Sequence, residues 1–153
     1  MLEHVAKVAS LAEVTLHVGY GTFEPVRVDD VAQHSVSSEH YEISNAAAQK
    51  INEARTNGGR VIVVGTTTMR ALESAANERG EVVAGRGEAS LTIKPGYRFQ
   101  VADALLTNFH LPRSSLLILV SAFAGRELVL HAYRRAVAER YRFYSYGDCM
   151  LIL

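Results

Sequence analysis

The stretch Arg60-Val61-Ile62-Val63-Val64-Gly65-Thr66-Thr67-Thr68 decides the expected fold. Its continuous β-branched run is typical of a strand buried on both faces within a parallel sheet. We therefore expect residues 61–64 to form a central buried strand. The glycine and threonines that follow favour a turn into a helix over residues 69–79.

The sequence before this strand predicts a second helix and another strand. Ser44 is a suitable N-cap for a helix over residues 45–56, which Asn57-Gly58-Gly59 would end. Helix, strand and helix in succession are the usual unit of an α/β sheet. Apolar and polar residues alternate over residues 13–18, which predicts a half-buried strand with its apolar side chains toward the core.

The remaining sequence is consistent with one α/β domain over residues 1–153, built as a mixed sheet with flanking helices. We expect a polar surface excursion over residues 29–44 and short hairpins between 80 and 96. Further strands are expected at 97–101, 104–109 and 143–153, and helices at 114–123 and 127–140.

Composition narrows the class of protein. The 153 residues are 48% apolar and 21% charged, which is ordinary for a globular domain. Sixteen basic residues balance sixteen acidic ones, so any RNA contact has to be local. A single cysteine excludes an internal disulfide framework and fits a cytoplasmic protein, and the spacing of the six histidines predicts no metal site. We expect no signal peptide and no membrane span.

Two groups of residues carry candidate chemistry. The junction from Gly65 to Arg70 places backbone N–H groups and hydroxyls at a helix start, an arrangement that binds anions, although Thr66 or Thr67 could simply cap the helix. His17 and His110 stand beside expected strand ends, where α/β proteins place their sites, and either could act as a general base. Thr107-Asn108 adds a hydroxyl and an amide next to His110. The aromatic stretch over residues 142–148 could stack on a base or pack as a final strand.

Together these stretches resemble one known family. The matching segments are Thr15-Leu16-His17-Val18-Gly19 with Gly21-Thr22-Phe23 and Pro25-Val26, Gly65-Thr66-Thr67-Thr68-Met69-Arg70-Ala71-Leu72-Glu73-Ser74, Pro95-Gly96-Tyr97, Thr107-Asn108-Phe109-His110-Leu111-Pro112, Val120-Ser121-Ala122-Phe123-Ala124-Gly125, and Tyr141-Arg142-Phe143-Tyr144-Ser145-Tyr146-Gly147-Asp148. In order and spacing they resemble the S-adenosylmethionine:tRNA ribosyltransferase-isomerases of queuosine biosynthesis.

The resemblance implies an activity and its partners. Similar enzymes transfer and isomerise the ribosyl part of S-adenosylmethionine onto 7-aminomethyl-7-deazaguanine in the tRNA anticodon loop. They give epoxyqueuosine and release adenine and methionine. The expected protein is a cytoplasmic monomer that uses S-adenosylmethionine as substrate and needs no metal. Carried over, the expected catalytic residues are His17, His110 and Asp148. The expected substrate-binding residues are Thr66, Thr67, Arg70, Thr107, Asn108 and Tyr146. We expect six of these to approach one cleft, although they come from four separate segments: His17, Thr67, Arg70, Asn108, His110 and Asp148.

The chain also departs from the family. Val36-Ser37 replaces the usual Met-His, and Ala89-Ser90, Thr92 and Lys94 replace Thr-Asp and aromatic positions. Family members are about twice this length, with a β-barrel domain and a Pro-Thr-Ala-Gly-Leu-His-Phe motif that this sequence lacks. We therefore expect the C-terminal part of a larger α/β domain, with an N-terminal half that is missing here. Two alternatives stay open: a non-catalytic tRNA-binding fragment, and a small α/β binder of an anionic metabolite.

Overall fold

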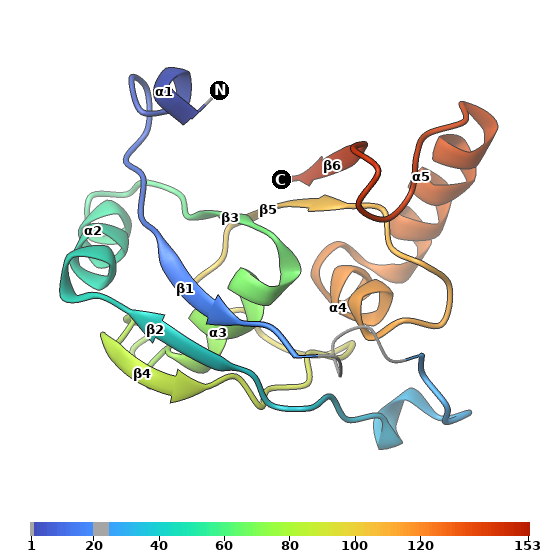
Figure 1. Cartoon of the computed structure of the whole chain (residues 1–153), viewed down its shortest axis with the longest axis horizontal. Coiled ribbons are helices and arrows are strands. Elements are labelled where there is room, and N and C mark those ends of the chain that lie inside the picture. Colours follow the sequence, from blue (N-terminus) through green and yellow to red (C-terminus); the bar gives the residue numbers. More distant parts are fainter. Residues whose placement is uncertain (1, 20–24) are drawn as a thin grey trace.

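The computed structural model describes residues 2–19 and 25–153, and its elements follow the expected α/β pattern (Figure 1). In chain order they are α1 (Leu2–Val5), β1 (Val14–His17), the 3-10 turn η2 (Val31–Gln33), β2 (His40–Ile43), α2 (Asn45–Thr56), β3 (Ile62–Val64), α3 (Thr66–Ser74), β4 (Gly85–Glu88), β5 (Ala104–Asn108), α4 (Ser115–Ala124), α5 (Arg126–Ala138) and β6 (Cys149–Ile152).

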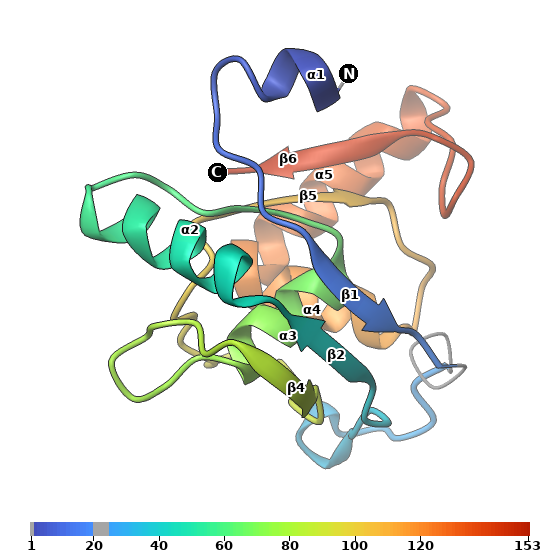
Figure 2. The same cartoon turned by 60° about the vertical axis from the view of Figure 1, so that its left-hand side comes forward.

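The described strands form two three-stranded sheets, one of which is mixed as we expected. The first is antiparallel, in the order β1-β2-β4. The second has the order β3-β5-β6, with β3 parallel and β6 antiparallel to β5. Helix α3 contacts β1 of the first sheet, β3 and β5 of the second, and α4 (Figure 2). The α/β class is confirmed, and the described residues contain no closed barrel.

The prediction that residues 61–64 form a central, fully buried strand was wrong. β3 lies at an edge of its sheet and pairs only with β5 among the described strands. Val63 is 2% exposed, but Ile62 and Val64 are 49% and 64% exposed. A β-branched run favours extended backbone wherever it occurs, so it does not separate a central strand from an edge strand.

Helix starts were predicted better than helix ends. The Ser44 side chain accepts a hydrogen bond from the Ala47 N–H at 3.1 Å, which confirms the N-cap of α2. Helix α3 begins at Thr66 rather than 69 and ends at Ser74 rather than 79. It ends early because the side chain of Asn77 accepts from the N–H groups of Arg79 and Glu81, which folds this segment into a turn.

Two other expectations were wrong. Residues 97–101 form no strand, because the buried carboxylate of Glu73 accepts from the N–H groups of Gln100, Val101 and Ala102 and holds them as a loop. The excursion over residues 29–44 includes the strand β2, whose partners are β1 and β4. Of the matching segments, Gly21-Thr22-Phe23 lies outside the described residues.

The helices do not include a membrane span within the part of the chain that the structure describes. No single helix there is long and apolar enough to cross a bilayer. Helices α4 and α5 are long and apolar enough for a bilayer only when they are taken together. The chain bends by 116° between the two helices.

Candidate functional site

The start of α3 is open to a ligand. Gly65 is the N-cap residue, with φ of 91°, and it offers no side chain to accept from the first-turn N–H groups. Its own N–H donates to the Leu106 carbonyl at 2.9 Å, which fixes the turn to the end of β5. The interpretation of Thr66 or Thr67 as the cap is therefore wrong, since both belong to the first turn of α3. A helix start of this kind carries partial positive charge and suits an anion.

A hollow of about 300 Å³ lies beside this helix start. It brings together five of the nine residues that the sequence predicted, and four others that complete its wall. The predicted ones are Thr66, Thr67, Thr107, Asn108 and His110, and the others are Gly65, Leu116, Tyr144 and Ser145. We call this hollow the threonine cleft. Its residues come from the start of α3, the end of β5, the first turn of α4 and the loop before β6.

His110 is the most strongly perturbed residue of the threonine cleft. It is 6% exposed, its Nε2 lies 3.0 Å from the Thr107 Oγ1, and its N–H donates to the Tyr133 hydroxyl at 2.8 Å. Burial lowers the pKa of the imidazole to about 4. The ring is therefore neutral near pH 7, with one nitrogen carrying a hydrogen and the other free to accept one.

The loop over residues 142–148 forms one wall of the cleft, and Asp148 holds that loop closed. The Asp148 carboxylate accepts from the Arg142 N–H at 2.6 Å and from its guanidinium at 3.0 and 3.2 Å. These hydrogen bonds lower the pKa of Asp148 below its ordinary value. The Asp148 carbonyl in turn accepts from the Asn108 side chain at 3.1 Å. The structure thus places Asp148 behind the cleft wall rather than among the lining residues.

Tyr146 also lies outside the cleft lining, and its side chain is exposed. Its neighbours Tyr144 and Ser145 line the cleft instead. Tyr144 has a positive φ of 64°, and its N–H donates to the Phe109 carbonyl at 2.7 Å. The sequence prediction named Tyr146 and Asp148 of this segment and did not name Tyr144 or Ser145. A left-handed backbone at a tyrosine is not visible in sequence, so no signal distinguished them.

Arg70 is buried and holds backbone rather than lining the cleft. Its guanidinium pairs with Glu39 at 2.9 Å and donates to the carbonyls of Ser37, Ala89 and Leu91. Burial lowers the pKa of Arg70, while the charge of Glu39 raises it. The other Glu39 oxygen accepts from the N–H of Gly19, two residues after the end of β1.

Ser37 and Ala89, two of the positions at which the sequence resemblance breaks down, contact Arg70 of this ion pair. Arg70 bonds the carbonyls of Ser37 and Ala89, and the Val36 N–H donates to the Thr92 hydroxyl at 3.1 Å. Carbonyl oxygens are present whatever the side chain, so the contacts of Arg70 tolerate a change of residue at 37 and 89.

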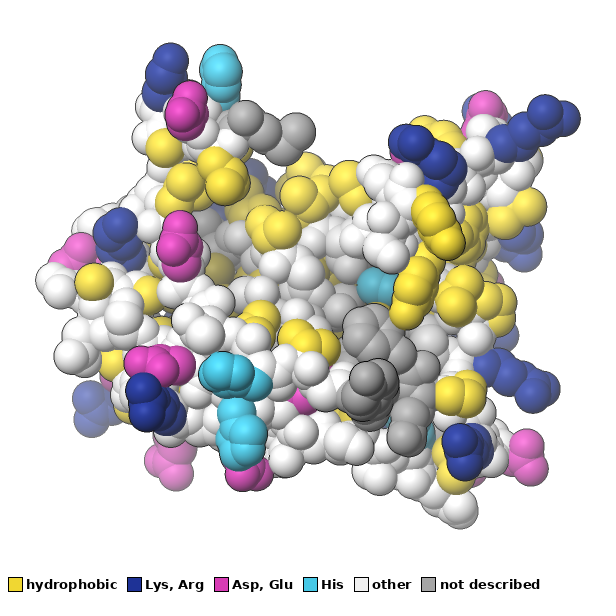
Figure 3. Space-filling model, in the orientation of Figure 1, with side chains coloured by type: hydrophobic (Ala, Val, Ile, Leu, Met, Phe, Trp, Pro, Cys, Tyr) yellow, Lys and Arg dark blue, Asp and Glu magenta, His cyan; other side chains and the backbone are white. Residues whose placement is uncertain are grey.

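His17 lines a different hollow. It is paired in register with His40 on the exposed face of the β1-β2-β4 sheet, beside Tyr41, Arg86 and Glu88. Histidine side chains gather over β1 and β2 in the lower part of Figure 3. The structure therefore does not bring His17 and His110 into one cleft.

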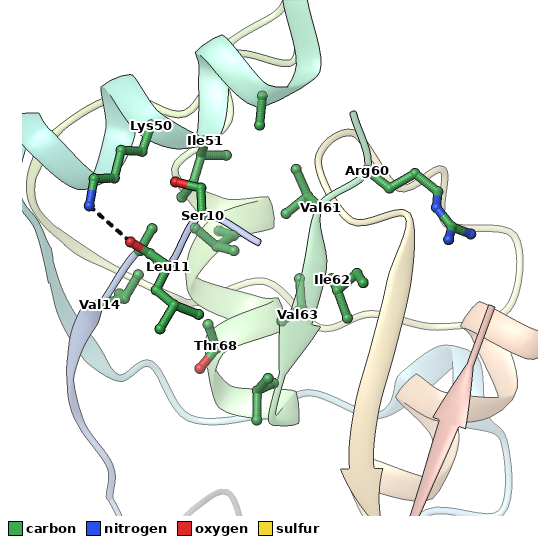
Figure 4. Close-up of a pocket in the computed structure, with 14 residues that line it drawn as sticks. Ser10, Leu11, Val14, Lys50, Ile51, Arg60, Val61, Ile62, Val63 and Thr68 are labelled. Atoms are coloured by element: carbon green, nitrogen blue, oxygen red, sulfur yellow. Dashed lines mark hydrogen bonds between the residues drawn. The ribbon is translucent and has the colours of Figure 1, made fainter. Parts of the chain in front are cut away.

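A further hollow, of about 240 Å³, lies between residues 10–14, α2 and the outer edge of β3 (Figure 4). Its wall is mainly apolar and includes Leu11, Val14, Ile51 and Val63. Lys50 closes one side by donating to the Leu11 carbonyl at 3.1 Å. The figure shows the apolar side chains on facing elements pointing toward one another across this space.

Polar side chains collected at a glycine-capped helix start and an adjoining strand end form an arrangement that suits a small anionic ligand. The comparisons give the family. A family model described as queuosine biosynthesis protein matches residues 1–152, and the chain belongs to this family.

The similar proteins are longer than this chain and are named as enzymes. The chain is 56% identical over 144 residues to the S-adenosylmethionine:tRNA ribosyltransferase-isomerase of Desulforamulus reducens. This alignment covers 94% of this chain and 42% of that protein. It is 59% identical over 147 residues to the enzyme of the same name from Azoarcus sp.. That alignment covers 96% of this chain and 42% of the relative. The chain therefore spans about two fifths of the curated relatives it matches.

A solved structure agrees with the fold. The crystal structure of S-adenosylmethionine tRNA ribosyltransferase from Thermotoga maritima superimposes with a TM-score of 0.80 at 44% sequence identity. The match covers 99% of this chain and 48% of that one.

Proposed function

We propose that this chain supplies part of the active site of an S-adenosylmethionine:tRNA ribosyltransferase-isomerase, and that the threonine cleft is its contribution. The reaction would transfer and isomerise the ribosyl group of S-adenosylmethionine onto 7-aminomethyl-7-deazaguanine in tRNA, with release of adenine and methionine. The observation that carries the proposal is the gathering of Thr66, Thr67, Thr107, Asn108 and His110 around one hollow in a member of this family.

The chemistry of the cleft suits the two ends of the donor substrate. The methionine part of S-adenosylmethionine ends in a carboxylate, and the start of α3 offers N–H groups and the hydroxyls of Thr66 and Thr67 to an anion. The Asn108 amide nitrogen donates one of its hydrogens to the Asp148 carbonyl, and the amide oxygen can accept from a ribose hydroxyl.

His110 is the base that we propose for this cleft. Similar enzymes are thought to remove a proton beside the sulfur before adenine leaves and the aminomethyl nitrogen attacks the sugar carbon. A neutral imidazole accepts such a proton, and Thr107 fixes the orientation of the ring through the 3.0 Å contact with its Nε2. His17 lines a different hollow, so the proposal gives it no role in this cleft.

The test replaces the matching region of the Thermotoga maritima enzyme by these 153 residues and measures adenine and methionine released from S-adenosylmethionine and tRNA that carries the deazaguanine. We expect turnover in the chimera, and a loss of roughly 100-fold in kcat for His110→Gln, which keeps a hydrogen-bonding side chain but accepts no proton. The control is His131→Gln on the exposed face of α5, which leaves the rate unchanged. Full activity of the His110→Gln chimera would place the chemistry elsewhere.

The same assay tests the 153-residue chain alone. We expect no turnover, because a site assembled from two parts of a longer chain loses its geometry when one part is absent. Addition in trans of the remaining part of the Thermotoga enzyme should restore release of both products. Turnover of the isolated chain within about tenfold of a full-length relative would contradict this expectation.

A further inference from the structure

Basic residues are concentrated in one part of this neutral chain. Residues 113–142 contain six arginines and two glutamates, a formal charge of +4, whereas the whole chain is neutral. This region is α4, α5 and the residues that flank them. Dark-blue side chains accordingly line the right-hand side of the molecule in Figure 3, where Figure 1 shows α4 and α5. A basic face of this kind is the usual electrostatic mark of a nucleic-acid contact.

A hollow of about 440 Å³ opens on this face. Its floor includes the half-buried Leu117 and Ile118 of α4 and Leu130 of α5. Its rim includes three exposed arginines, Arg27, Arg113 and Arg126, and we call it the arginine hollow. Asp29 is the acidic residue of the lining.

Two of these arginines are held side by side by the backbone. The Val26 N–H donates to the Arg113 carbonyl at 2.7 Å, and Pro25 forms a bridge with Ser114. Arg113 has a φ of 55°, a left-handed conformation that is uncommon for an arginine and costs about 1 kcal/mol or more. Arg126 pairs with Glu127 at 2.7 Å, but both side chains are largely exposed, and such surface pairs are weak and exchange readily with a phosphate.

The arginine hollow and the threonine cleft are neighbours. Three peptide units separate Arg113 from His110, so their Cα atoms lie within roughly 11 Å of one another. Leu116 lines the cleft and Leu117 lines the hollow, both from the first turn of α4. A nucleotide strand with one base in the cleft therefore has its adjoining phosphates within reach of the arginines.

We propose that the arginine hollow binds the phosphodiester backbone of the substrate RNA beside the base that enters the threonine cleft. The three guanidiniums contact phosphate oxygens, and the apolar floor receives the face of a flanking nucleotide. This inference rests on the proposed function, because it takes RNA as the substrate, and it adds the surface on which that RNA lies.

The experiment measures the Kd of the 153-residue chain for a labelled anticodon stem-loop RNA by fluorescence anisotropy at several salt concentrations. The test variant is Arg27→Gln/Arg113→Gln/Arg126→Gln. The matched control, Lys7→Gln/Arg79→Gln/Arg86→Gln, removes the same charge from exposed positions away from α4 and α5. We expect the test variant to bind the RNA roughly tenfold more weakly. The slope of log K against log salt should become shallower by about two, because each of three lost phosphate contacts on a single strand contributes about 0.7. The control should keep most of the affinity and the slope.

A charge change of opposite sign gives a second readout. Asp29→Asn should tighten RNA binding, a result that a purely structural role of this surface does not produce. Circular dichroism melts confirm that each variant is folded. Equal affinity of the two triple variants would overturn the proposal, as would absence of RNA binding by the unaltered chain. The proposal would also be overturned if the test variant changed the oligomeric state but not the Kd for RNA, because the hollow would then belong to a protein interface. Product release by the chimera is measured separately, so the proposed function can stand if this surface fails.

Discussion

His110 combines deep burial with a titratable ring, and this combination makes folding depend on pH. Its pKa is about 4 in the folded chain against an ordinary 6.5. Between these values the unfolded chain binds a proton that the folded chain does not, so the free energy of unfolding falls as the pH drops from 6.5 to 4.

The expected size of this effect is up to about 3 kcal/mol. Urea denaturation of the unaltered chain and of His110→Gln at several pH values measures it. The unaltered chain should lose stability more steeply than the variant over this interval, since other titrating groups are common to both. Parallel pH profiles would contradict burial of a neutral ring.

The Glu39–Arg70 pair predicts a second effect at single residues. Both side chains are buried, and Arg70 ties α3 to the segments at 37 and 89–91. Arg70→Met leaves the Glu39 carboxylate buried without this cation, which costs about 3–5 kcal/mol. Thermal and urea unfolding of Arg70→Met, Glu39→Leu and the double variant measure it. The double variant should be less destabilised than the two single changes add up to, and strict additivity would show that the pair is not coupled.

Residues that act through long-range contacts were the hardest to predict from the sequence. Thr66, Thr107 and His110 stood out because hydroxyls and imidazole beside strand and helix ends are a local pattern. In the sequence, Arg70 was recognisable only as a cation one turn into a helix. No local pattern indicated that its guanidinium pairs with Glu39. The same holds for Glu73, whose carboxylate organises residues 100–102 from a different element.

At the level of elements, β3 has one unpaired side within the described structure. Val61 accepts from the N–H groups of Asp103 and Ala104, and the Gly65 N–H donates to Leu106, so these positions point toward β5. Alternation along a strand directs the backbone groups of Ile62 and Val64 to the opposite side, toward the hollow of Figure 4. An exposed strand edge with apolar side chains favours pairing with another chain.

Val64→Lys should therefore reduce concentration-dependent self-association of the isolated chain. A lysine at an edge strand opposes edge-to-edge pairing. Sedimentation velocity over a range of concentrations measures the effect. Leu128→Lys, an exposed apolar residue of α5 that gains the same charge, serves as the control. Equal behaviour of the two variants would mean that the edge of β3 does not drive association.

Elements with a complete local signal were predicted closely. Ser44 and Ser114 mark the starts of α2 and α4, and both accept from the expected N–H groups. The β2 strand gave no such signal, because its pairing with β1 and β4 depends on partners distant in sequence. For the same reason the β-branched run of β3 indicated a strand but not its place in the sheet.

For the whole molecule, the sequence established the α/β class and the family, but not the division into two sheets. The division depends on α3, which contacts both sheets and α4. It places Thr66 and Thr67 beside the end of β5, while β1 carries His17 to the face of the other sheet. The residues predicted from sequence to share one cleft therefore lie at two separate hollows.

The uneven charge distribution also governs how the molecule meets a partner. A neutral chain with a formal charge of +4 on residues 113–142 carries a charge of −4 on the remainder, and this separation of charge gives the molecule an electric dipole. In the field of a polyanion such a molecule turns its α4–α5 face forward before contact, and encounters in productive orientation become more frequent. The association rate constant, more than the lifetime of the complex, should then fall as ionic strength rises. By orienting during diffusion, a protein without net charge would thus associate with a polyanion as fast, and with as strong a salt dependence, as a strongly basic protein does.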